Sequence, residues 1–139
     1  MARPSEFDIG SIWLFSACNH SQLRTIRRAV EEIAVPEGRV LCEEGSVGRE
    51  FFYIVDGTAT VKRKGRKVAT LGPGKYFGEL SLLDRKPRNA TIVSDTPMKL
   101  IVLDQRRFNG LLDAVPALGH KLLVAMAGRI RDADARTVN

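Results

Sequence analysis

The sequence has few of the residues that metal sites and nucleophilic enzymes require. Its 139 residues include only two histidines, His20 and His120, without a His-x-His pair, and two cysteines, Cys18 and Cys42, without a Cys-x-x-Cys pair. Transition-metal sites need clusters of such ligands, and two distant thiols make no disulfide framework. No Gly-x-Ser-x-Gly elbow provides a serine nucleophile. We therefore expect a protein that is not an enzyme and that binds no metal or cofactor, and we reject a metal-dependent barrel enzyme. The histidines should lie on the surface and the thiols should be inert.

Long apolar runs are also missing. No stretch approaches the about 18 apolar residues that span a bilayer, and charges interrupt the first ten residues, where a signal peptide would be apolar. The sequence thus predicts a cytoplasmic protein without a membrane segment. With 139 residues, of which 44% are hydrophobic, the chain can bury one core. We expect a single domain over residues 1–139.

The net charge of +6 raises the question of a nucleic-acid partner. The densest basic run, residues 62–67, surrounds Gly65 between two segments that read as strands. This pattern is typical of an exposed hairpin tip. Only eight residues follow Arg131, which is too few for a DNA-binding domain after the last expected helix. We expect no such domain in this chain.

Hydrophobic spacing predicts helices at both ends and strands between them. Ser21 is an expected N-cap for a helix over 21–34, inside an N-terminal helical segment 10–35. A β-rich centre over 36–103 is punctuated by glycine, and two C-terminal helices are expected over 104–135, the first capped by Asp104. The expected strands are 39–42, 51–55, 58–64, 67–71, 90–94 and 98–103. The fold class is mainly β, a rolled antiparallel sheet with flanking helices.

The most informative segment runs from Phe77 to Thr91. Gly78 permits a sharp turn and a close backbone approach to a ligand. Arg88 offers a rigid fork suited to a phosphate, and Pro87 restricts the loop before it. Glu79 can accept a hydrogen bond from a hydroxyl group. An ordinary ion pair beside a turn is the bland alternative, but the small and apolar residues around these groups agree with a phosphate-binding segment.

This segment closely resembles the phosphate-binding cassette of the cyclic-nucleotide-binding domain family. The resemblance continues through Glu44-Gly45 and Leu71-Gly72-Pro73-Gly74 and covers roughly residues 14 to 131. It implies a double-stranded β-helix, or jelly-roll-like β-roll, with an N-terminal helix and C-terminal lid helices. It also implies ligand contacts from Phe77, Gly78, Glu79, Leu80, Ser81, Arg88, Asn89 and Ala90. Asn89 departs from the usual alanine, serine or threonine; the resemblance associates threonine there with cGMP and alanine with cAMP, so this position leaves both nucleotides open. Of the two, we expect cAMP rather than cGMP as the ligand.

The resemblance also implies a regulatory mechanism. Val61 and Val68 are candidate contacts for the base or sugar, although core valines have the same pattern. Met126, Arg129 and Ile130 are lid candidates on the C-terminal helix, which could also pair with its copy in a homodimer. We expect a cyclic nucleotide sensor that shifts this helix and acts on an unknown protein effector. The alternatives are a truncated regulatory domain of a transcription factor, channel or kinase, and a degenerate scaffold that no longer binds.

Overall fold

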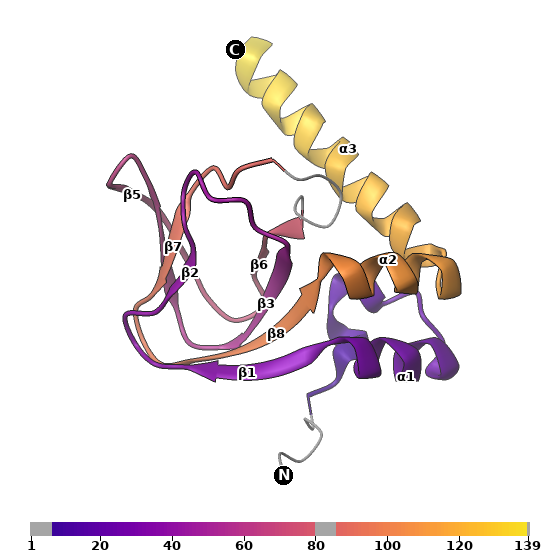
Figure 1. The fold of residues 1–139 in the computed structure, drawn as a ribbon. Helices are drawn as coiled ribbons and strands as arrows, with labels where there is room; N and C mark the ends of the chain where they lie inside the picture. The colour runs from indigo at the N-terminus through magenta and orange to yellow at the C-terminus, as the bar shows by residue number, and fades with distance from the viewer. Residues whose placement is uncertain (1–6, 80–85, 139) are drawn as a thin grey trace.

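The protein folds as a β-roll with helices gathered at one end (Figure 1). The computed structural model describes residues 7–79 and 86–138, without the side chains of Ala125, Arg129 and 132–138. Leu80 and Ser81, two of the expected ligand contacts, lie outside the described residues. The double-stranded roll and its flanking helices confirm the predicted fold class.

Two four-stranded antiparallel sheets make the roll. In the first sheet the order is β1 (Glu31–Val35), β8 (Met98–Asp104), β3 (Glu50–Asp56) and β6 (Tyr76–Phe77). In the second it is β2 (Val40–Cys42), β7 (Thr91–Ser94), β4 (Ala59–Arg63) and β5 (Arg66–Leu71). All six strands expected from the sequence are present, whereas β1 and β6 were not expected.

The helix α1 (His20–Ala29) ends earlier than the sequence indicated. The prediction extended it over 21–34, because Val30 and Ile33 continue the helical spacing. In the structure Glu31–Val35 instead forms β1, where Ile33 pairs with Leu100 along the edge of β8. Sheet pairing therefore overrides the local pattern. Ser21 is also not the N-cap, because Asn19, two residues earlier, caps the helix and forms a reciprocal capping box with Gln22.

The remaining helices follow the sequence more closely. Asp104 caps α2 (Gln105–Ala114) by accepting a hydrogen bond from the backbone N–H of Arg107, as predicted. Pro116 precedes α3 (Ala117–Val138), and two short 3-10 helices, η1 (Ile9–Ser11) and η2 (Trp13–Phe15), lead into α1. In the described part of the chain no single helix is long and apolar enough to cross a membrane. Only α2 and α3 up to Gly128 would be, taken together across a bend of 116°.

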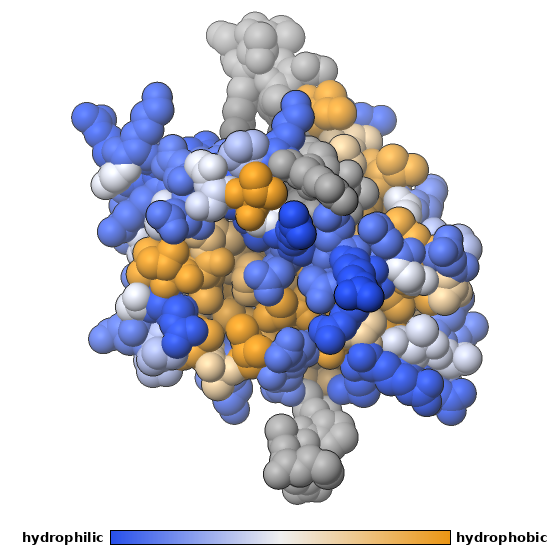
Figure 2. All heavy atoms as spheres, viewed as in Figure 1, coloured by the Kyte–Doolittle hydropathy of each residue, from blue (hydrophilic) through white to orange (hydrophobic). Residues whose placement is uncertain are grey.

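The first sheet is buried on both faces, because alternate residues of β8 enter two different cores. Ile101 and Leu103 pack against the helices, together with Phe15, Ile26, Phe108, Leu118 and Leu122. Leu100 and Val102 face the second sheet, with Phe52, Ile54, Ala59, Phe77 and Ile92. Figure 2 shows hydrophobic side chains across the middle of one face of the roll, with hydrophilic ones around them. The helices are thus fixed to the same sheet that forms one wall of the roll.

Candidate ligand-binding pocket

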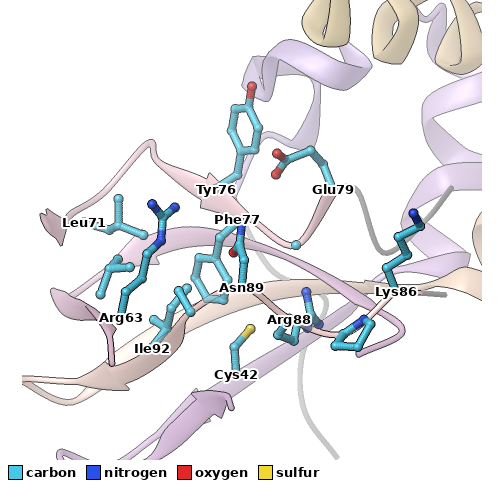
Figure 3. A pocket seen from close by; sticks show the side chains of 14 residues that line it. Cys42, Arg63, Leu71, Tyr76, Phe77, Glu79, Lys86, Arg88, Asn89 and Ile92 are labelled. Atoms are coloured by element: carbon cyan, nitrogen blue, oxygen red, sulfur yellow. The ribbon is translucent and has the colours of Figure 1, made fainter. Parts of the chain in front are cut away.

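A cavity of about 350 Å³ opens in the roll, on the side of the second sheet. Its volume lies in the range of small-molecule sites. Strands β2 and β4 to β7, with the segment before β7, supply its walls (Figure 3). Six of the eight expected cassette residues line it: Phe77, Gly78, Glu79, Arg88, Asn89 and Ala90. These six residues therefore share one cavity, and their contact with a ligand stays a prediction.

Arg88 is held by hydrogen bonds on both its backbone and its side chain. One guanidinium nitrogen, Nη2, donates to the carbonyl oxygen of Glu50 at 2.9 Å. The Arg88 backbone N–H donates to Ser46 at 2.8 Å, and its carbonyl accepts from Gly45 at 2.9 Å. An isolated β-bridge joins the preceding Pro87 to Val47. The loop between β2 and β3 thus fixes the backbone of Arg88, and the first residue of β3 holds its guanidinium.

Two glycines leave room for that guanidinium. A Cβ at Gly48 would lie 1.7 Å from Nε of Arg88, and a Cβ at Gly78 would lie 2.7 Å from Nη1. Gly78 also has a φ of +83°, and its Cβ would meet the carbonyl oxygen of Glu50 at 2.4 Å. Any side chain at Gly48 would displace the arginine. The sequence showed Gly48 only as a turn residue, because it lies 40 positions from Arg88 and nothing local links the two.

Glu79 is a buried carboxylate, only 5% exposed. It lines the pocket and also a much smaller cavity bounded by Trp13, Tyr76 and Leu122. Figure 3 shows Glu79 beside Tyr76, above the pocket and close to the helical end of the molecule. Burying a carboxylate is costly unless it has polar partners, and Glu79 has an interaction within the protein. This residue therefore connects the pocket to η2 and α3.

The opposite end of the pocket differs from the prediction. Val61 lines it as expected and also packs against the core between the sheets. Val68 does not line it, because an irregularity in the pairing of β4 with β5 leaves Val68 outside the register, 52% exposed. Arg63, Leu71 and Tyr76 line the pocket and were not expected there. The sequence could not identify these three residues, because nothing in the pattern of a short strand shows which of its side chains face a ligand.

The lid candidates are not part of the pocket wall. Met126 is half-buried and Ile130 is 61% exposed, and neither lines the cavity. The side chain of Arg129 lies outside the description. In Figure 1 α3 extends from α2 past the roll toward the C-terminus. Trp13 on η2 is 39% exposed, with the Lys121 ammonium 4.9 Å from its ring centroid.

A buried thiol adds to the electrostatics of the pocket. Burial raises the pKa of Cys42 to about 11, although the nearby Arg88 guanidinium lowers it and Glu50 raises it further. The thiol is therefore neutral at physiological pH and adds no negative charge to the pocket. Burial also raises the pKa of Cys18. Both histidines are exposed, and the described residues contain no group of three or more His, Cys, Asp or Glu that could hold a metal.

Comparisons with known proteins agree with this geometry. The cyclic nucleotide-binding domain family matches residues 32–114. The chain is 36% identical over 100 residues to a cAMP-dependent protein kinase regulatory subunit of Schizosaccharomyces pombe, covering 71% of the chain and 24% of that protein. It is 33% identical over 114 residues to a cyclic nucleotide-gated potassium channel of Rhizobium etli, covering 82% of the chain and 32% of the channel.

Among solved structures, the catabolite activator protein of Thermus thermophilus superposes with a TM-score of 0.81 at 28% sequence identity. The alignment covers 90% of this chain and 61% of that protein. The chain therefore spans only a quarter to a third of the two curated relatives, and less than two thirds of this structural one.

Proposed function

The chain belongs to the cyclic nucleotide-binding domain family, and from this we propose that it binds a cyclic nucleoside monophosphate as a regulatory module. Domains of this family are typically non-catalytic, and we propose no reaction for this one. The observation that carries the proposal is that Arg88 and Glu79 line the same cavity as Gly78. A cyclic nucleotide is a compact monoanion that carries a ribose hydroxyl close to its phosphate. The two side chains match these two groups.

In this proposal the phosphate lies at the cassette end of the pocket. Arg88 donates to the phosphate oxygens, and the backbone around Gly78 can approach them because no Cβ intervenes. Glu79 accepts a hydrogen bond from the ribose 2′-hydroxyl. A bond to a charged group contributes about 1.5–3 kcal/mol, so the two residues account for much of a micromolar affinity, about 8 kcal/mol.

We propose that the signal leaves the pocket through Glu79. Its carboxylate borders both the pocket and the small cavity against Trp13 and Leu122, so a ligand that engages it can alter packing at the base of α3. Ligand affinity for one packing over the other then shifts the population. NMR chemical shifts across α3 should change on saturation, and unchanged shifts would contradict this step.

Two protein partners are proposed, an effector and a second copy of this chain. The matched segments make up only 24% of the kinase regulatory subunit and 32% of the channel, which fits a module that passes its signal to other protein parts. Leu123, Val124 and Ile130 leave apolar surface exposed on α3, where a second copy of the chain could pair. The sequence-based expectation of cAMP over cGMP remains a prediction.

Calorimetric titration with cAMP and with cGMP tests the binding function. We expect one site per chain, no comparable heat with linear 5′-AMP, and loss of binding in Arg88→Ala. Because Arg88 also bonds the Glu50 carbonyl, the thermal melt of each variant must show that it folds. Arg24→Ala, an exposed arginine on α1, is the matched control and should bind like the wild type. A wild-type protein that binds neither nucleotide would make the chain a non-binding scaffold.

A further inference from the structure

The end of the pocket farthest from the cassette carries a second arginine. Arg63 is the last residue of β4 and lines the cavity together with Val61, two positions earlier on the same face of the strand. Figure 3 shows Arg63 beside Leu71, with Phe77 and Asn89 between it and Arg88. The phosphate site and Arg63 are therefore at opposite ends of one cavity.

Backbone contacts hold the hairpin that carries Arg63. The turn has positive φ at both Lys64 and Gly65, 51° and 77°, which suits the twist of a two-residue hairpin. The Lys64 N–H donates to Oε1 of Glu44 at 2.9 Å, and the Glu44 N–H donates to Oγ1 of Thr91 at 3.0 Å. The adjacent Gly45 bonds Arg88. The same loop thus positions both arginines.

The side chain of Arg63 makes no hydrogen bond or ion pair with any residue of 7–79 and 86–138. Its neighbours along the hairpin, Lys62, Lys64, Arg66 and Lys67, are all cationic and exposed. A guanidinium only donates, and the side chain of Arg63 is exposed, so water satisfies its N–H groups in the free protein. Acceptors on a ligand in the pocket would take the place of that water.

We propose that Arg63 is a specificity-determining residue that reads the base and favours guanine over adenine. The proposal rests on the proposed function, because the phosphate must occupy the Arg88 end for the base to reach Arg63. Guanine presents two adjacent acceptors, O6 and N7, which match the arginine fork. Adenine presents N7 beside the N6 amino donor, so one of the two bonds is replaced by facing donors. The pocket then prefers cGMP.

This preference is opposite to the one expected from the sequence. Asn89 in the cassette leaves both nucleotides open, because the family associates threonine at that position with cGMP and alanine with cAMP. The expectation of cAMP involved no residue of the hairpin. Arg63 gives a direct chemical reason for guanine, and titration decides between the two.

The test compares three ligands on three proteins by calorimetry. The ligands are cGMP, cAMP and cyclic IMP, whose base keeps O6 and N7 but lacks the amino group at C2. The proteins are the wild type, Arg63→Ala and the control Lys62→Ala, which removes the same charge from the neighbouring residue on the other face of β4. We expect Arg63→Ala to weaken cGMP and cyclic IMP roughly tenfold and cAMP little, and Lys62→Ala to leave the ratios unchanged.

The outcomes separate the two proposals. If Arg63→Ala weakens all three ligands equally, Arg63 acts on the phosphate or by charge alone, and the proposal is overturned while the binding function stands. The same holds if the wild type prefers cAMP and Arg63→Ala keeps that preference. Cyclic IMP that binds like cAMP would also overturn it, since the acceptor pair would then not be what is read. If the wild type binds none of the ligands, the binding function itself fails.

Discussion

The two ends of the pocket use the same residue type in opposite surroundings. Arg88 lies between two glycines, bonds the Glu50 carbonyl and has its backbone fixed by Ser46. Arg63 stands on an exposed hairpin with no partner among the described residues. A fixed guanidinium loses little entropy on binding and suits a phosphate that every cyclic nucleotide has in common. A guanidinium with open donors suits the part of the ligand that varies.

Gly48→Ala is expected to break the fixed end with the largest effect. The added Cβ would overlap the Arg88 guanidinium, which is the movable end of a side chain, so the arginine is displaced while the fold survives. We expect roughly 100-fold weaker cyclic nucleotide binding by calorimetry, equivalent to the loss of about one strong hydrogen bond to a charged group. Gly72→Ala is the matched control, because its Cβ would enter open space without a positive φ. Unchanged affinity in Gly48→Ala would show that Arg88 need not occupy this position.

Glu79→Gln tests the proposed hydrogen bond between this carboxylate and the ribose 2′-hydroxyl. The amide keeps the shape and removes the charge, so affinity should fall about tenfold. The 2′-deoxy form of the same nucleotide should lose a similar factor on the wild type and much less on the variant. Equal losses on both proteins would contradict a bond between Glu79 and the 2′-hydroxyl. A thermal melt of the variant checks that removing the buried charge leaves the fold intact.

The titration of Cys42 tests how well the Arg88 end of the pocket is buried from water. Its pKa is raised from 9.0 to about 11, so the folded protein keeps the proton that the unfolded chain releases. The free energy of unfolding contributed by this thiol is therefore fully present below pH 9 and falls as pH rises toward 11. At pH 10 the loss should be about 1.4 kcal/mol. Urea unfolding of wild type and Cys42→Ala at about pH 8 and about pH 10 measures it, and equal pH slopes would argue against the burial.

The smallest effect is expected from salt. Interactions between exposed charges are weak, and salt screens them beyond about 10 Å at 0.1 M ionic strength. We therefore expect the hairpin lysines to raise the affinity only about twofold at low salt and not at all at high salt. Lys62→Ala should bind about twofold more weakly than wild type at low salt and equally at high salt. The loss in Arg88→Lys should persist at both, because bidentate geometry is not screened. If the affinity of Arg88→Lys returned to the wild-type value at high salt, the contrast between the two ends of the pocket would be removed.

Local signals predicted much of this fold. The six expected strands, the hairpin at Gly65 and the cap at Asp104 depend on residues close together in the chain, and all are present. The sequence failed where a distant strand decided the outcome. Ile33 fits a helical spacing from Val30, yet the edge of β8 recruited it into β1. Strand β6 has only two residues, too few for any periodicity.

The sequence by itself determined the cassette end of the pocket, because Gly78, Glu79 and Arg88 lie within eleven consecutive positions and each has chemistry that suits an anion. Only the tertiary structure decided what surrounds it. Gly48 makes room for Arg88, and Arg63 faces the same cavity from β4, through contacts between segments far apart in the chain. Such proximity depends on how the strands pair, and strand register is a property of the whole sheet.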